Sequence, residues 1–226
     1  MILLGAAVNG AAIAVGTLLG IVAGKLLQER IKNTLLAVMA LITIGIAVSG
    51  LTDNQNALVP IISLVAGSLL GEALDIDGKV TALGDSLQRR FQDHGSLTEG
   101  FVTGSLVFAV GAMAIMGALD SGLQGDHTVL YAKSLIDAVY SVVFASTMGI
   151  GVAFSAVTVF VVEGAMALLA SLIAPLLSSY VIAEVTYVGS LLIVAISLNM
   201  LGITKLRILN MAPSILFPLV LCQFMK

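Results

Sequence analysis

The chain has 226 residues, of which 59% are hydrophobic and only 10% are charged, whereas an average soluble domain has about 25% charged residues. This composition excludes a water-soluble globular fold, and a net charge of -3 excludes a basic surface for nucleic acid. Because a membrane span needs about 20 apolar residues, the length predicts an all-α integral membrane protein, a single transmembrane domain of seven to eight helices over residues 1–226.

The reactive residue types needed for catalysis are scarce. Cys222 is the only cysteine and lies in the last apolar stretch, so an intrachain disulfide or a thiolate metal cluster cannot form. The sequence contains no HExxH, GxSxG or GxxxxGK[ST] motif. We therefore expect no enzymatic activity, no cofactor and no bound metal.

Eight charge-poor stretches are long enough to cross the hydrocarbon core of a bilayer. The first one lacks a basic region ahead of it, so we read it as a span and not as a cleaved signal. The stretches run near residues 2–24, 34–51, 57–74, 100–119, 132–149, 151–170, 184–203 and 207–225.

Basic residues collect in three of the connections between these stretches. With eight crossings, all three connections face the same side, and the positive-inside rule makes that side cytoplasmic. Both termini are therefore predicted to be extracytoplasmic. The three clusters are Lys25 with Arg30 and Lys32, Lys79 with Arg89 and Arg90, and Lys205 with Arg207.

A polar segment near 76–99 separates the third and fourth stretches. Its apolar residues recur every three or four positions, at Ile76, Val80, Leu83, Leu87 and Phe91. This spacing, with Arg89 and Arg90 beside it, predicts an amphipathic helix on the cytoplasmic membrane surface. The alternative is a solvated connector.

The two halves of the chain resemble each other. Residues 5–16 align with 100–111, with glycines eleven positions apart in each, and residues 37–51 align with 189–203. The first copy covers about 1–75 and the second about 100–226, with an inserted hairpin near 132–170. Because the copies start on opposite sides, they form an inverted repeat, as in many secondary transporters. The alternative is chance similarity between helices rich in small residues.

Two carboxylates interrupt the spans of the second half. Each buried ionisable side chain costs at least about 2.5 kcal/mol on insertion scales, so it needs a partner or a function. Asp137 follows Lys133 by four residues, a spacing that allows a structural ion pair as well as a transport role. Glu163 has no basic residue within a helical turn. It either lies in a functional cavity or sits at headgroup level.

The sequence between these carboxylates contains two glycines one residue apart. An unbroken helix over 132–170 would be about 58 Å long, too long for one crossing. The chain must therefore break, and we expect a re-entrant hairpin or discontinuous helices whose ends bind a small ion. The alternative is an ordinary tight turn. The residues of this expected site are Ser146, Thr147, Gly149, Gly151 and Ser155.

Two asparagines also lie within spans. Asn9 and Asn199 are expected either to contact the transported solute or to make hydrogen bonds between helices. Glycines at GxxxG spacing, Gly16-Gly20-Gly24 and Gly67-Gly71, allow close helix packing. This packing occurs either between helices of one chain or between the subunits of an expected homo-oligomer.

The segment KSLIDAVYSVVFASTMGIGVAFSAV, residues 133–157, resembles the DUF554 family of bacterial inner-membrane proteins. The similarity extends over the first span, GAAVNGAAIAVGTLLG, and over the closing segment GITKLRILNMAPSIL. The resemblance implies a bacterial cytoplasmic membrane location. It implies little about activity. The matching positions include Lys133, Asp137, Ser146, Gly149, Gly151 and Ser155.

These patterns favour a secondary transporter for a small ion or polar solute, with membrane lipid as its surroundings and no nucleic acid partner. Its substrate-binding or ion-binding residues would be those of 146–155 together with Asp137, Glu163, Asn9 and Asn199. A passive ion channel and a non-transporting scaffold or sensor are the alternatives.

Overall fold

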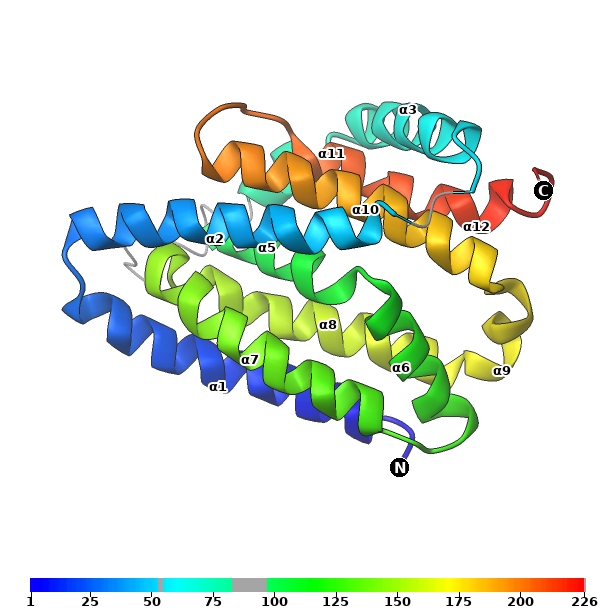
Figure 1. Ribbon diagram of the computed structural model, residues 1–226, viewed down its shortest axis with the longest axis horizontal. Helices are drawn as coiled ribbons and strands as arrows, with labels where there is room; N and C mark the ends of the chain where they lie inside the picture. Colours follow the sequence, from blue (N-terminus) through cyan, green and yellow to red (C-terminus); the bar gives the residue numbers. More distant parts are fainter. Residues whose placement is uncertain (53–54, 83–96, 226) are drawn as a thin grey trace.

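The computed structural model describes residues 1–52, 55–82 and 97–225, and every regular element in these ranges is helical (Figure 1). Nine helices make up most of the bundle. They are α1 Leu4–Leu26, α2 Glu29–Gly50, α3 Leu58–Leu74, α5 Leu97–Ala109, α6 Ala112–Leu123, α7 Thr128–Met148, α8 Gly151–Leu168, α10 Ser179–Met200 and α12 Phe217–Leu221. The shorter elements are α9 Ala170–Ile173, η1 Ala174–Leu176, α11 Ile208–Met211 and η2 Ala212–Leu216, and residues Ile76–Ala82 form a further short helix.

Five helices in the described ranges, α1, α2, α7, α8 and α10, are each long and apolar enough to cross a membrane. Two bent pairs also pass this test when each pair is counted as one span, which raises the number to seven. One pair is α3 with Ile76–Ala82, bent by 49°, and the other is α5 with α6, bent by 61°. The eighth predicted stretch corresponds to a shorter apolar run, Ile208–Leu221.

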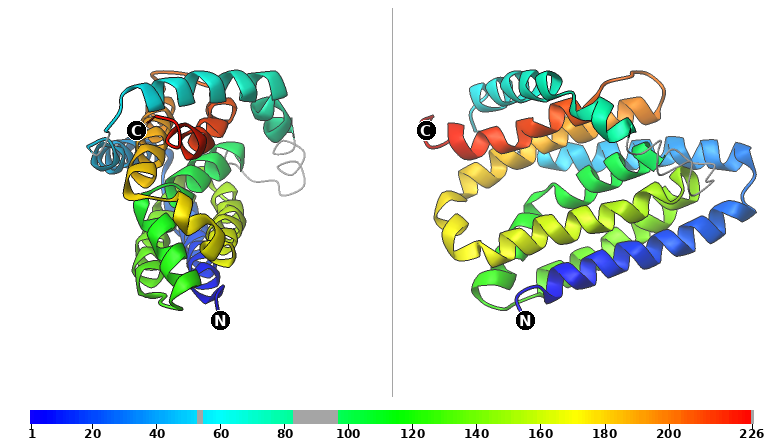
Figure 2. Two further views of the ribbon diagram at one scale, coloured as in Figure 1. Left: turned by 90° about the vertical axis from the view of Figure 1, so that its right-hand side faces the viewer. Right: turned by 180° about the vertical axis from the view of Figure 1, so that it is seen from behind.

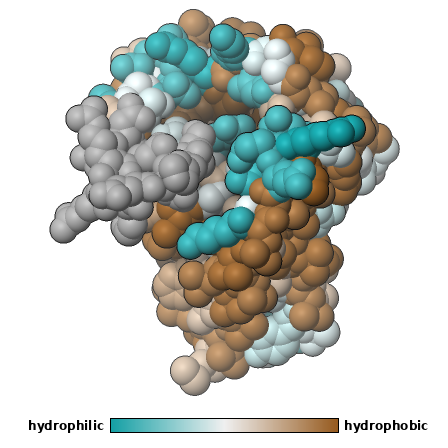
Figure 3. Space-filling view, turned by 90° about the vertical axis from the view of Figure 1, so that its left-hand side faces the viewer, coloured by the Kyte–Doolittle hydropathy of each residue, from teal (hydrophilic) through white to brown (hydrophobic). Residues whose placement is uncertain are grey.

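The surface is apolar and part of the interior is polar, as expected for a protein solvated by lipid. Leu18, Leu135 and Val139 are 63%, 73% and 66% exposed on the outer faces of their helices. Hydrophilic residues gather at the end that Figure 3 shows face-on, while the flank leading away from it is hydrophobic. This end carries the α1–α2, α7–α8 and α10–α11 connections, and both termini lie toward the opposite end (Figure 1).

Helices α1 and α7 run side by side in the same direction and pack at very close range (Figure 1). Three glycines of α1 allow this approach. A Cβ added to Gly16 would lie 2.5 Å from the Ala138 carbonyl oxygen, and one added to Gly24 would lie 2.6 Å from that of Ser146. Gly20 faces the α7 backbone between them. This GxxxG run therefore packs within one chain.

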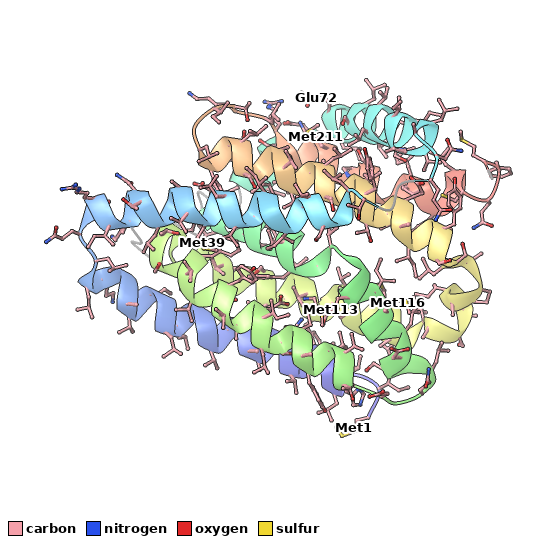
Figure 4. The ribbon with its side chains drawn as sticks, in the orientation of Figure 1. Met1, Met39, Glu72, Met113, Met116 and Met211 are labelled. Carbon is pink, nitrogen blue, oxygen red and sulfur yellow. The ribbon has the colours of Figure 1, made fainter. Side chains whose placement is uncertain are left out.

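A second group of helices lies against the first. Helix α2 packs on α10, and α3 covers the C-terminal elements from the outside (Figure 2). Gly67 and Gly71 of α3 meet the backbones of Ser214 and Asn210, so this glycine pair also packs within the chain. At the same contact, Glu72 lies near Met211 (Figure 4).

The expected re-entrant hairpin over 132–170 is corrected by the structure. Its two halves, α7 and α8, have 21 and 18 residues and are each long enough to span. The chain reverses between them through Gly149, whose φ of +75° is in a region that glycine adopts without strain. The reversal is thus a tight turn, and the bent pairs are elsewhere.

The polar segment near 76–99 is described over residues 76–82 and again at its last three residues, which begin α5. Residues Ile76–Ala82 are helical, as the periodicity predicts, and this helix is set at an angle to α3 through Asp75, which has a φ of +46°. The predicted positions Leu83, Leu87 and Phe91, with Arg89 and Arg90, lie outside the described residues.

Candidate functional site

A cluster of four polar side chains lies inside the bundle, where α1, α7 and α8 meet. Asn9 Nδ2 donates hydrogen bonds to Asp137 Oδ2 at 3.0 Å and to Glu163 Oε1 at 2.9 Å. Lys133 Nζ donates to Asp137 Oδ2 and lies 3.4 Å from Glu163 Oε1. The two carboxylates are therefore joined by one lysine and one amide.

All four side chains are withdrawn from solvent. Asn9 and Glu163 are fully buried, and the side chains of Lys133 and Asp137 are 8% and 6% exposed. Two further atoms of the cluster, Asn9 Oδ1 and Glu163 Oε2, are buried without a hydrogen bond from any described residue. A buried acceptor without a partner costs free energy, so the cluster has unused capacity to bind a donor.

The charges of this cluster do not balance when every group is ionised. Lys133 supplies one positive charge, and Asp137 and Glu163 supply two negative charges. An uncompensated charge in hydrocarbon is costly, whereas the uptake of one proton or one monovalent cation makes the cluster neutral. The arrangement can therefore bind and release a positive charge.

The cluster lies well inside the expected membrane region. Asp137 is nine residues after the start of α7 at Thr128, which corresponds to about 13 Å along the helix. This is close to half of the roughly 30 Å hydrocarbon core.

One side of the cluster borders a cavity of about 380 Å³. Lys133 and Asp137 line it from α7, and residues of α2, α5, α6 and α10 form the remaining walls. Its polar lining residues are Lys133, Asp137, Tyr140, Ser49, Thr186 and Ser190. The volume is at the small end of the range of about 300–1,000 Å³ for ligand sites.

A break in a helix borders the same cavity. Val110 and Gly111 separate α5 from α6 and line the cavity together with Met113, which is labelled at the start of α6 in Figure 4. Gly111 has φ +138° and ψ 152°, a conformation that is essentially restricted to glycine. Irregular backbone at membrane depth is tolerated where it lines a cavity. Of the two bent pairs, α5–α6 is thus the one whose break lines this cavity, and the sequence did not predict a break at Gly111.

The residues expected at 146–155 lie away from the cluster. Ser146, Thr147 and Gly149 line a separate cavity of about 220 Å³, together with the end of α1 and the start of α2, which contribute Lys25 and Lys32. The Ser146 and Thr147 hydroxyls donate to carbonyl oxygens of their own helix. The structure therefore places this motif at the polar end of the bundle.

Two more members of that motif have packing contacts. Gly151 begins α8, and an added Cβ would lie 2.9 Å from Leu97 Cα. Ser155 is buried against Gly104 and donates its hydroxyl to the Val152 carbonyl oxygen at 2.6 Å. Neither residue lines the cavity beside Asp137.

Asn199 lies near the end of α10 and bonds to the connection that follows it. Its side chain accepts hydrogen bonds from Thr204 Oγ1 and from the Leu206 backbone N–H, and donates to the Leu206 carbonyl oxygen. These bonds order the connection after α10. The structure thus brings together Asn9, Asp137 and Glu163 from the prediction, and leaves Asn199 at a turn.

Two buried or partly buried polar groups were not anticipated. Glu184 is fully buried in α10 and accepts hydrogen bonds from the backbone N–H groups of Gln55 and Asn56, just before α3. Asn210 donates to Glu72 and accepts from the Asp77 N–H at 2.8 Å. The only sequence signal for Glu184 is its acidic side chain at the edge of an apolar stretch.

A metal is not favoured at any described position. No group of three or more His, Cys, Asp or Glu side chains in residues 1–52, 55–82 and 97–225 is arranged to hold a metal ion. The cluster has only two carboxylates, and both face Lys133.

The fold and the site define a multi-pass α-helical membrane protein with ionisable side chains buried between its helices. The model of the family described as "Protein of unknown function (DUF554)" matches residues 4–223, and the chain belongs to this family. No solved structure matches the chain.

Two bacterial relatives are similar over nearly their whole lengths. The "Uncharacterized membrane protein YdfK" of Bacillus subtilis (strain 168) is 29% identical over 214 residues, which cover 93% of this chain and 91% of the relative. The "Uncharacterized protein YqgA" of Escherichia coli (strain K12) is 27% identical over 219 residues, with 94% and 93% covered. The first of these names agrees with the membrane assignment.

Proposed function

We propose that this protein is a secondary transporter that moves a small ion or polar solute across the bacterial cytoplasmic membrane. The observation that carries the proposal is the buried cluster of Lys133, Asp137, Glu163 and Asn9, which has one positive and two negative side chains beside a cavity. Intramembrane ionisable residues of this kind are typical of proton relays and solute pathways.

The chemistry of the cluster favours coupling to a proton. Glu163 has one oxygen that receives bonds and a second, Oε2, that has no described partner. A proton on this carboxyl makes the cluster neutral, and its release restores a net charge of -1. Because Lys133 contacts both carboxylates, a change at Glu163 alters the ion pair at Asp137, which faces the cavity. The cluster can thereby link proton binding to solute binding.

The architecture supports the same proposal through the repeat. The aligned segments in α2 and α10 pack on each other, and α3 packs on the C-terminal elements that correspond to it. Figure 1 draws the members of each pair running in opposite directions. Transporters with inverted repeats hold their site between the two copies. With the basic end cytoplasmic, both termini are extracytoplasmic.

The test is proton flux into liposomes that contain the purified protein and a trapped pH-sensitive dye. An imposed proton gradient should dissipate faster with the protein than without it, and candidate solutes are then added to find one that accelerates flux. Glu163→Gln keeps the shape of the side chain and removes its titration. We expect this variant to lose at least about 90% of the protein-dependent flux, the tenfold effect that corresponds to about 1.4 kcal/mol.

Glu29→Gln is the matched control, because Glu29 is an exposed partner of Lys32, and its side chain is 81% exposed. This control should retain normal flux. Equal flux in Glu163→Gln and in the original protein would refute proton coupling through the cluster. Ohmic single-channel currents with no solute coupling would instead identify a channel.

A further inference from the structure

The cavity beside the cluster has two chemically different walls. On α7, Lys133 and Asp137 present opposite charges, and Tyr140 lies one helical turn further on. Both hydrogen bonds that Asp137 receives from described side chains end on Oδ2, which leaves Oδ1 for another donor. The charged wall thus offers a site for a positively charged group of a ligand.

A second wall, formed by α2 and α10, is lined by hydroxyl groups. Ser49, Thr186 and Ser190 line the cavity there. The Thr186 hydroxyl oxygen is buried and makes no hydrogen bond to any described residue. A buried hydroxyl without a partner costs free energy, and a ligand that accepts a hydrogen bond removes this cost.

A third wall is the first turn of α6. Gly111, Met113 and Ala114 line the cavity, and no side chain caps this end of the 12-residue helix. The N-terminus of a helix carries a partial positive charge and unpaired N–H groups that favour a carboxylate. Discontinuous transporter helices recognise substrate carboxylates in this way. The Thr186 hydroxyl and the start of α6 therefore favour a negatively charged group.

We propose that the cavity binds a compact zwitterion of the amino-acid class, with its ammonium at Asp137 and its carboxylate between Thr186 and the first turn of α6. This inference rests on the proposed transport function and names the solute. The cavity of about 380 Å³ limits the solute to a small one. A zwitterion also adds no net charge, so the proton balance of the cluster remains that of Lys133, Asp137 and Glu163.

The test is equilibrium binding to the purified full-length protein in lipid nanodiscs, measured by calorimetry. The probes are L-alanine and its two singly charged analogues, ethylamine and propionate, each at millimolar concentration. L-Alanine should bind, and each analogue should bind at least about tenfold more weakly, because it leaves one of the two polar walls without its partner. Equal binding of either analogue would overturn the zwitterion assignment.

Substitutions then locate the bound probe. Thr186→Val keeps the side-chain volume, removes the unpaired hydroxyl and should weaken L-alanine binding about tenfold. Thr43→Val is the control, since the Thr43 hydroxyl donates to the Met39 carbonyl oxygen of its own helix and does not line the cavity. Unchanged L-alanine affinity in Thr186→Val would overturn the proposed position of the carboxylate.

Binding and proton flux separate this inference from the transport proposal. If L-alanine, L-serine and glycine all fail to bind while Glu163-dependent flux persists, the zwitterion inference is wrong and the transporter proposal stands. If L-alanine binds at the cavity but no flux depends on Glu163, the site assignment stands and the proton-coupled function is wrong.

Discussion

Lys133 Nζ lies 3.4 Å from Glu163 Oε1, although the two residues are 30 positions apart and belong to helices that run in opposite directions. The same ammonium bonds to Asp137 one helical turn along α7. One lysine therefore serves as counter-ion to two carboxylates. The behaviour of the cluster should depend on which of its three charges is removed.

Removing the lysine should make stability depend strongly on pH. In Lys133→Met, two buried carboxylates lose their counter-ion, and breaking a buried pair costs about 3–5 kcal/mol. Protonation of the carboxylates removes the unpaired charges, so the deficit should shrink as the pH is lowered. Thermal unfolding in detergent measures this deficit against the original protein.

Two further variants test the explanation for the lysine variant. Lys32→Met removes a surface pair with Glu29 and should change the unfolding temperature little, because exposed pairs contribute at most about 1 kcal/mol. Adding Asp137→Asn to Lys133→Met should recover part of the loss, because one buried negative charge disappears. A deficit of equal size at every pH would contradict the charge explanation.

Removing the amide of Asn9 should destabilise the protein and disturb proton flux together. Asn9→Leu removes two hydrogen bonds to carboxylates, each of which contributes about 1.5–3 kcal/mol. We expect a lower unfolding temperature and reduced flux in the liposome assay. The exposed Asn33, changed to Ala, provides the comparison. Unaltered flux in Asn9→Leu would show that the amide is only structural.

Gly111 should be more sensitive to substitution than another glycine with equal space around it. A Cβ at Gly111 or at Gly45 would meet no atom within 4 Å, so neither change causes a clash. Gly111 has φ +138°, a conformation that costs alanine about 1–3 kcal/mol. Gly111→Ala should therefore destabilise the protein and lower flux, whereas Gly45→Ala, inside α2, should be neutral or slightly stabilising. If the two variants had similar unfolding temperatures, the backbone conformation at Gly111 would tolerate a side chain and this explanation would be wrong.

Gly20 should not tolerate a larger residue. An added Cβ would overlap the Val142 carbonyl oxygen, which belongs to the backbone of α7 and cannot rotate away. Overpacking of this kind costs about 1–3 kcal/mol. Gly20→Ala should lower the unfolding temperature without changing the oligomeric state, because the contact is within one chain. A change in the oligomer measured by light scattering, with stability retained, would assign this glycine to a subunit interface instead.

Asp126 lies outside the membrane region and should make a small contribution to the pH dependence of the protein's stability. The Thr128 side chain and backbone N–H donate hydrogen bonds to this carboxylate and hold its pKa below the ordinary value. A carboxyl with a lower pKa in the folded state stabilises the fold above its unfolded pKa, and this contribution disappears as the pH falls through the folded value. In Thr128→Val, this stability contribution of Asp126 should be lost at a higher pH. An identical acid profile in the variant would exclude this contribution.

Much of the fold was predictable because membrane spans are marked by local composition. Five of the eight predicted stretches correspond to single helices that are long enough to span, two correspond to bent pairs, and the eighth corresponds to a shorter apolar run. The Lys133 and Asp137 pair was also accessible, since its members are four residues apart on one helix. These features depend on neighbours along the chain.

The rest of the site depends on contacts between distant segments. Asn9 reaches Asp137 and Glu163 across 128 and 154 residues, a pairing that no local pattern encodes. A break within a span was expected near Gly149 and occurs at Gly111. Both glycines have positive φ, and only the packing decides that Gly149 ends a full span whereas Gly111 interrupts a bent pair. Glu184 was missed since its partners are backbone N–H groups, which every sequence contains.

The close packing of α1 on α7 also determines which parts of the protein can move. Backbone meets backbone at Gly16, Gly20 and Gly24, so α1 cannot slide along α7 without a collision at three levels. Asn9 and Asp137 are thereby carried by one rigid pair of helices. In the proposed transport cycle this pair would be the fixed frame, and the access path to the cavity would open through motion of α2, α10 or the α5–α6 break at Gly111.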